Sequence, residues 1–188
     1  MTCPERGECA VPRQYWSAVL PPLHVADGAA YASSVTLTDV SRAPQKQLPA
    51  YTLEEGTEIE LMGHGLFSNT GTPTLILGFY YGGVAGVALA ATTAITTTTG
   101  AASWPWQLFY RGRVRATGTS GSINGQGWIK LGTSLVAFTL RPIPETLALR
   151  TVTIDTTIVK TLTVGAQWGT SSASNTLTCN DLSVRLLS

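Results

Sequence analysis

The sequence has little charge, few cysteines and few histidines. Charged residues make up 12% of the 188 residues, whereas a soluble domain ordinarily has about 25%. The net charge of +1 argues against broad electrostatic attraction to nucleic acid or to an anionic membrane. Three cysteines, Cys3, Cys9 and Cys179, do not make a disulfide framework. Cys3 and Cys9 can close a loop if oxidised, but we expect both to be reduced.

Threonine, glycine and proline take the place of the missing charge. The chain contains 28 threonines, 19 glycines and ten prolines. Threonine is β-branched and favours strands, and glycine and proline favour the turns between them. This composition predicts an all-β protein. A weakly charged surface also does little to keep copies apart, which suits a protein that works within an assembly.

The first 45 residues differ from the rest of the chain. The opening MTCPERGECAVPR is charged and lacks the apolar core of a secretion signal, so we expect synthesis in the cytoplasm without export by that route. Half of the prolines lie here, and we predict an extended N-terminal arm over residues 1–45 with one strand at 33–38. Tyr15, Trp16 and Leu23 favour burial. They pack either on their own domain or on a neighbouring subunit.

Apolar and polar side chains alternate from residue 46 onward. Ile59 and Leu61 point one way and Glu58 and Glu60 the other, which is the two-residue period of a half-buried strand. About eight such segments occur, at 57–63, 73–83, 84–92, 104–118, 122–132, 134–140, 152–169 and 176–187. They predict an antiparallel β-sandwich over residues 46–188, with a jelly roll as the expected topology.

Turn signals separate these segments. Gly82–Gly83, Asn124–Gly125 and the SSASN stretch at 171–175 are each expected to form a turn. Residues 75–95 carry no charge and are long enough to cross a bilayer as a helix. The glycine pair inside them and the absence of flanking basic anchors favour a β-hairpin instead.

The order of these segments resembles a group of jelly-roll structural proteins of tailed bacteriophages. PTLILGFYYGG, WQLFYRGRVRATGTSG and the segment from TIDTTIVKTLTVGAQWG to the final strand carry the resemblance. It covers about residues 50–187 and leaves out the arm. Such proteins are head decoration or cement proteins, head fibres or minor tail proteins. The resemblance implies no catalytic residues.

Arg111, Arg113 and Arg115 share one face of their predicted strand. They form either a basic ridge that binds acidic groups of a neighbouring subunit or a solvated face paired across strands with Glu58 and Glu60. As partner-contact residues we therefore name Tyr15, Trp16, Leu23, Arg111, Arg113 and Arg115.

Metal, sugar and catalytic sites have weaker support. His64 lacks further ligands at useful spacing. Asp155 is expected to bond backbone amides in a turn, with calcium binding alongside Asn180 or Asp181 as the alternative. The tryptophans at positions 104, 106, 128 and 168 form either sandwich core or a sugar-stacking platform. No cofactor, resident metal, catalytic triad or pair of catalytic carboxylates is predicted.

These observations predict a non-enzymatic protein of the phage virion. The first hypothesis is a capsid decoration, or cement, protein on the capsid exterior. It binds the major capsid protein and copies of itself as a homotrimer, an oligomer taken from analogy. The alternative is a host-attachment module of a tail or head fibre that binds cell-surface glycan.

Overall fold

The computed structural model describes residues 18–19, 27–28, 30–41 and 46–187. Within them, 57% of the residues are in strands and none is in an α-helix. Every pairing between the described strands is antiparallel. The prediction of an all-β, two-sheet antiparallel protein is confirmed.

Fourteen strands are described, and eight of them span five residues or more. One sheet has the order β1–β14–β5–β9–β10–β11, with β2 beside β14 and β12 beside β10. Its strands are β1 (Ala18–Val19), β2 (Tyr31–Ala32), β5 (Glu58–Ser68), β9 (Trp104–Ala116), β10 (Gly121–Gly132), β11 (Phe138–Ile143), β12 (Thr151–Ile154) and β14 (Thr176–Leu187). We call this sheet A.

The other sheet, sheet B, has the order β3–β13–β6–β7, with β4 beside β13 and β8 beside β6. Its strands are β3 (Thr38–Asp39), β4 (Lys46–Leu48), β6 (Thr74–Tyr81), β7 (Val87–Ala91), β8 (Ile95–Thr96) and β13 (Lys160–Trp168). A 3₁₀ turn, η1 (Leu147–Arg150), joins β11 to β12.

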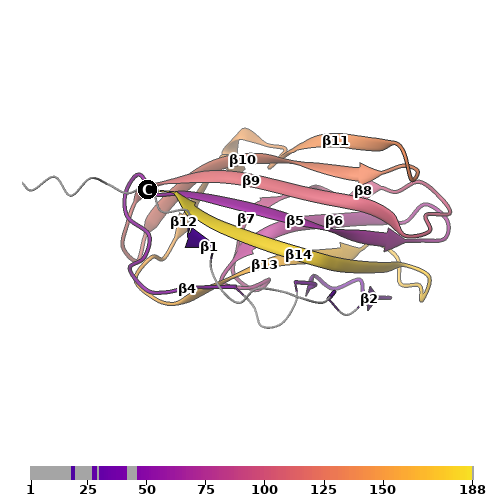
Figure 1. Ribbon diagram of the computed structural model, residues 1–188, viewed down its shortest axis with the longest axis horizontal. Helices are drawn as coiled ribbons and strands as arrows, with labels where there is room; N and C mark the ends of the chain where they lie inside the picture. Colours follow the sequence, from indigo (N-terminus) through magenta and orange to yellow (C-terminus); the bar gives the residue numbers. More distant parts are fainter. Residues whose placement is uncertain (1–17, 20–26, 29, 42–45, 188) are drawn as a thin grey trace, which may run out of the picture.

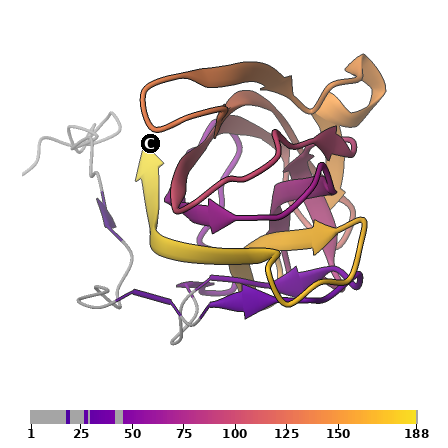
Figure 2. The ribbon, with the colours of Figure 1, turned by 90° about the vertical axis from the view of Figure 1, so that its right-hand side faces the viewer.

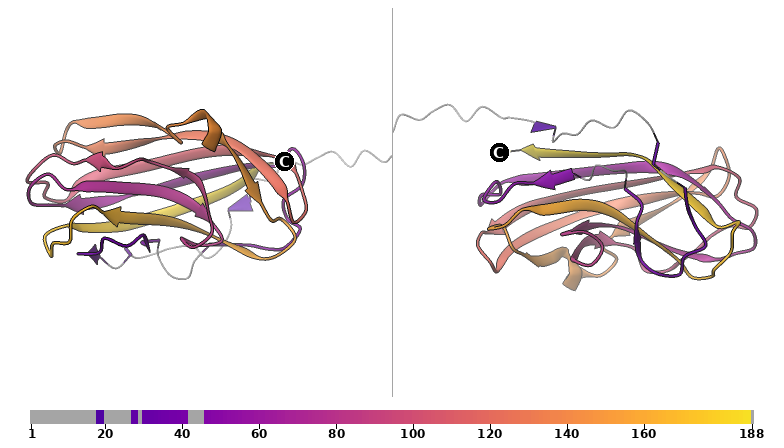
Figure 3. Two further views of the ribbon diagram at one scale, coloured as in Figure 1. Left: turned by 180° about the vertical axis from the view of Figure 1, so that it is seen from behind. Right: turned by 90° about the horizontal axis from the view of Figure 1, so that it is seen from below.

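The two sheets form the two layers of a sandwich. The long strands of sheet A lie side by side in Figure 1, with β6 and β7 behind them. Seen end-on, the strands surround a common interior (Figure 2). Figure 3 turns the molecule so that sheet B comes to the front in its left panel. Outward side chains of sheet A therefore point away from the core over a broad, open face.

Alternation in the sequence decides which side chains fill the interior. In β5 and β9 buried residues follow one another at every second position. The largest fully buried side chains include Trp106, Tyr110, Phe67, Phe79 and Trp168. Burying an aromatic side chain removes about 150–250 Å² of surface from water, so these rings provide much of the stabilising apolar contact.

The segment at 75–95 forms a hairpin rather than a continuous helix. β6 and β7 pair across it, and Gly82 and Gly83 both have a positive φ in the turn, where glycine meets no steric penalty. No helix in the described part of the chain has the length and apolar character of a membrane span.

The turn predicted at Asn124–Gly125 is wrong. Both residues lie inside β10, and Gly125 pairs with Gly112 of β9. The Tyr110 ring occupies the space that a side chain at either glycine would need. These glycines therefore admit the ring into the core rather than reverse the chain, and the turn lies at Gly118–Ser120.

Three other predicted strands need correction. The segment expected at 152–169 is two strands, β12 in sheet A and β13 in sheet B, with residues 155–159 between them. Residues 33–37 are not in a strand, and the short strands β2 and β3 flank them. The strand expected at 134–140 begins at Phe138. Residues 133–137 form a turn instead, because the Thr133 amide donates to the Ala137 carbonyl at 2.9 Å and the Ser134 hydroxyl accepts from the amides of Val136 and Ala137.

Part of the segment predicted as an arm runs along the sandwich. β2 pairs with β14 of sheet A, and β3 pairs with β13 of sheet B. Tyr31 packs against the core, and its hydroxyl donates to the Ser34 carbonyl at 2.7 Å. Tyr15, Trp16 and Leu23 lie outside the described residues, as do Cys3 and Cys9.

Candidate functional site

The outer face of sheet A carries charged side chains toward one end of its strands and aromatic ones beside them. Register places Glu60 opposite Arg111 and Arg185, and Glu58 opposite Arg113. We call these five side chains the charged ladder. One step along the strands, register places Met62 opposite Phe109 and Phe109 opposite Trp128.

The charged side chains of the ladder pair with one another. The Glu58 carboxylate accepts hydrogen bonds from Arg111 and Arg113, with Nε–oxygen distances of 2.8 Å and 3.1 Å. These bonds hold the pKa of Glu58 below its ordinary value, and the same contact raises the pKa of Arg111. Glu60 forms an ion pair with Arg185 at 3.6 Å.

These contacts test one of the two hypotheses for the arginines of β9, namely pairing across strands with Glu58 and Glu60. The cross-strand pairing with Glu58 is confirmed for Arg111 and Arg113. Among the described residues, Glu60 forms its ion pair with Arg185 rather than with one of the three arginines on β9. Arg115 is exposed and has no ion pair among the described residues. Contact of these arginines with another subunit stays a prediction.

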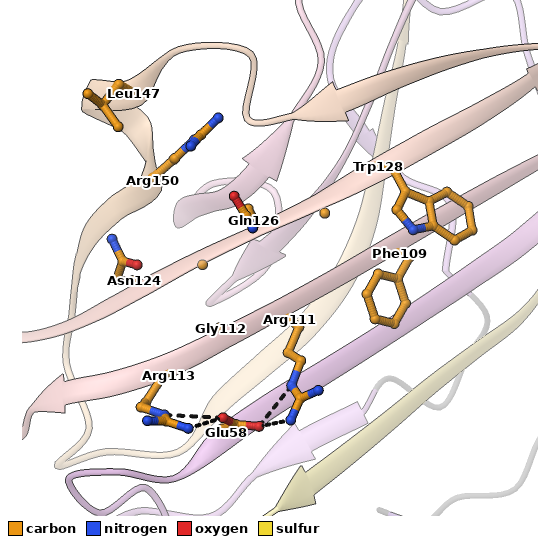
Figure 4. Close-up of a pocket in the computed structure, with 12 residues that line it drawn as sticks. Glu58, Phe109, Arg111, Gly112, Arg113, Asn124, Gln126, Trp128, Leu147 and Arg150 are labelled. Carbon is orange, nitrogen blue, oxygen red and sulfur yellow. Dashed lines mark hydrogen bonds and ion pairs between the residues drawn. The ribbon is translucent and has the colours of Figure 1, made fainter.

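Two aromatic rings lie beside the charged ladder. The ring centroids of Phe109 and Trp128 are 5.6 Å apart, and the ring planes differ by 21°. In Figure 4 the rings lie next to each other over β9 and β10, each with a face toward the viewer. The Lys130 ammonium lies 4.9 Å from the Trp128 ring centroid and 5.1 Å from that of Phe138. Both Phe109 and Trp128 are only half-buried.

A groove of about 580 Å³ runs between these elements and η1. This volume falls within the roughly 300–1,000 Å³ of ligand sites in proteins. Its lining includes the aromatic pair, two residues of η1 and the polar side chains of Asn124, Gln126 and Glu58. Figure 4 shows Asn124 and Gln126 between Arg150 on one side and Arg111 and Arg113 on the other. The groove therefore combines flat apolar surface with polar groups along its length.

Arg150 differs from the other arginines of the groove. It lies at the end of η1, and its Nε is buried without a hydrogen-bond partner in the described part of the chain. No carboxylate among the described residues pairs with it. Among the described residues Arg150 thus has no carboxylate partner, whereas Arg111 and Arg113 share that of Glu58.

A third surface is the edge of sheet A formed by β11 and the turn before it. Val136 is 95% exposed, and Phe138 and Leu140 are each 57% exposed. We call this surface the apolar edge, and its members are Leu135, Val136, Phe138 and Leu140. Leu147 and Leu149 of η1, beyond the other end of β11, are also exposed, but they line the groove and a pocket beside β7. Soluble proteins usually expose such residues singly, so this group along β11 makes the apolar edge a candidate interaction surface.

The four tryptophans singled out in the sequence have different surroundings. Trp106 and Trp168 are fully buried in the core, and Trp104 packs against it in an edge-on contact with Phe67. Trp128 alone among the four lies on the outer face beside the groove. A platform made of all four is therefore wrong, because strand alternation sends 104 and 106 inward.

The predicted turn role of Asp155 is confirmed. Its Oδ1 accepts bonds from the amide and the hydroxyl of Thr157 at 2.9 Å and 2.7 Å, and these bonds lower its pKa. Asn180 donates to Asp27 at 2.7 Å. His64 lies on the outer face of β5, opposite Gln107. Among the described residues no three His, Cys, Asp or Glu side chains gather as a metal site.

Sequence reasoning missed the apolar edge and Arg150. A signal for the edge was present, because Leu135, Val136, Phe138 and Leu140 follow one another closely with little polar alternation. The sequence did not indicate a role for Arg150, since its position beside the groove depends on where the chain places η1. Comparisons with protein-family models, curated proteins and solved structures give no match for this chain.

Proposed function

We propose that this chain is a non-enzymatic structural protein of a tailed-phage virion, with a jelly-roll sandwich that decorates the capsid exterior and stabilises the head. The resemblance over residues 50–187 supports the phage assignment. The apolar edge is the observation that supports binding to a protein partner. Low net charge supports residence in an assembly, where copies lie close together.

The apolar edge suits a protein partner for physical reasons. Burying apolar surface stabilises a complex by roughly 25 cal/mol per Å², and aromatic side chains such as Phe138 are enriched among the residues that dominate binding. An edge strand also offers unpaired backbone groups to a neighbour. Pro142 and Arg141 limit such pairing at one end of β11, so side chains of the turn and of Phe138–Leu140 would make most of the contact.

In this proposal the partners are the major capsid protein and other copies of the chain, as a homotrimer. Tyr15, Trp16 and Leu23 of the arm would bind a neighbouring subunit and add contacts to those of the sandwich. Many copies on one shell would then strengthen attachment through avidity. No catalytic step, cofactor, membrane or nucleic-acid contact is part of the proposal.

Binding to purified heads tests the proposal. Heads of the encoding phage, prepared without this protein, are mixed with the purified chain and pelleted. We expect the chain to pellet at a saturating, fixed number of copies per head. A chain that stays in the supernatant at micromolar concentration would overturn the proposal. A chain lacking residues 1–26, which keeps β2, β3 and Tyr31, should bind more weakly.

A second candidate function is host attachment through cell-surface glycan, from a tail or head fibre. The groove favours it, because an exposed aromatic pair next to amide and guanidinium groups is the surface that sugar rings and hydroxyls contact. Binding of the purified chain to host cells, lost on Trp128→Ala, would support this function over the first.

A further inference from the structure

We propose that the groove between η1 and strands β9 and β10 binds an acidic sugar, with its ring against Phe109 and Trp128 and its carboxylate against Arg150. This inference rests on the second candidate function and adds to it the class of glycan. It depends on the charge of the groove, on the shape of its floor and on the state of Arg150.

The charge of the groove favours an anion. Its lining contains three arginines and a single carboxylate, that of Glu58. Arg111 and Arg113 share that carboxylate, so their combined charge is only partly neutralised. Arg150 adds a further positive charge without a carboxylate partner among the described residues. A guanidinium binds a carboxylate through charge-assisted hydrogen bonds, which are stronger than neutral ones.

The floor of the groove favours a ring with polar substituents. The half-buried rings of Phe109 and Trp128 offer an apolar surface with ring centroids 5.6 Å apart, and the Lys130 ammonium lies over the Trp128 ring, 4.9 Å from its centroid. Figure 4 shows the exposed amide of Gln126 between that surface and Arg150, and the amide of Asn124 further along β10. Asn124 donates to the Thr151 hydroxyl at 2.8 Å, which fixes its orientation and leaves its carbonyl oxygen to accept from a ligand.

A carboxylated sugar fits this arrangement better than a neutral sugar or an acidic peptide. A neutral sugar would leave the charge of Arg150 unmatched. An acidic peptide would match the charge but offers no rigid ring face to the aromatic pair. The groove pairs Arg111 and Arg113 with Glu58 but offers Arg150 no carboxylate among the described residues. The charge of the ligand is therefore the property that distinguishes these candidates.

The test measures binding of oligosaccharides of defined charge to the full chain. A galacturonic-acid trimer and the matched neutral galactose trimer are titrated against the isotope-labelled protein by NMR. We expect the acidic trimer to bind at least about tenfold more tightly, as one charge-assisted contact implies. Amide shifts should centre on β9, β10 and η1.

Matched variants locate the contact. Arg150→Gln should remove the preference for the acidic trimer and leave binding of the neutral trimer unchanged. Arg115→Gln removes an exposed arginine of β9 outside the groove and should keep the preference. Trp128→Ala should weaken both trimers. Each variant is checked by its melting temperature and by the spread of its amide spectrum, so that loss of fold is separated from loss of contact.

The outcomes distinguish failure of the acidic-sugar inference from failure of the second candidate function, glycan binding, on which it rests. Equal binding of both trimers would overturn the acidic class and leave carbohydrate binding standing. No binding of either trimer together with no binding to host cells would overturn both. A glutamate hexapeptide that binds as tightly as the acidic trimer, with the same dependence on Arg150, would overturn the sugar in favour of an acidic peptide.

Discussion

The charged ladder and the apolar edge belong to the same sheet but differ in how far their side chains are satisfied. In the ladder, Glu58 accepts from two arginines and Glu60 pairs with Arg185. In the apolar edge, side chains as large as Phe138 and Leu140 stay exposed. The ladder has partners within the chain, whereas the edge has a surface that another molecule would cover.

The difference shows that the sharpest sequence pattern, the three alternating arginines, is largely paired within the chain. Three arginines at alternate positions attract attention in the sequence, yet two of them share an internal carboxylate. Exposed ion pairs contribute about 0–1 kcal/mol each to stability. Burial of an exposed aromatic or leucine side chain against a partner contributes about 1.5–3 kcal/mol. We therefore propose the apolar edge as the main protein contact.

The largest effect should come from a charge placed in the apolar edge. Leu140→Asp should weaken attachment to phage heads by about a hundredfold, since the loss of a central contact costs about 2 kcal/mol or more and the buried charge adds to it. The pelleting assay measures this. Val35→Asp, at an exposed apolar position between β2 and β3, should leave binding unchanged. Equal losses for both variants would contradict a special role for the edge.

The next largest effect should be a difference in stability between a substitution on the inward face of β10 and one on its outward face. Gly125→Ala places a methyl group where the Tyr110 hydroxyl lies and should lower the free energy of unfolding by about 1–3 kcal/mol. Gln126→Ala, one residue on and facing outward, should change it by less than about 0.5 kcal/mol. Urea denaturation measures both. A stable Gly125→Ala variant would mean that the register of β9 and β10 differs from the one described.

A smaller effect should come from the charged ladder. Glu58→Gln should lower the free energy of unfolding by about 1 kcal/mol at pH 7. The folded-state pKa of Glu58 is lowered, so its contribution is present above its ordinary pKa of about 4.3 and is lost as the pH falls through the folded value. Wild type and variant should then converge near pH 2. A difference that persists there would show that packing, not charge, is responsible.

Much of the fold was predictable because alternation directly determines which face is buried. Glu58 and Glu60 point outward and Ile59 and Leu61 inward, as expected. The turn predicted at Asn124–Gly125 is wrong because Gly125 makes room for Tyr110 inside β10. The same residue pair is typical of a tight turn, so the sequence alone does not distinguish the two uses. The groove was not predictable from the sequence, because its lining comes from three separate elements, β9, β10 and η1. Sheet register brings β9 and β10 together, and the path of the chain after β11 brings η1 beside them.

A density map of the intact phage particle tests the central claim most directly. We predict that this sandwich fits density on the capsid exterior, with the apolar edge along β11 covered by the shell protein or by another copy of the chain. Density for the sandwich in which that edge faces solvent, or in which the chain lies away from the capsid on a tail or fibre, would contradict the account.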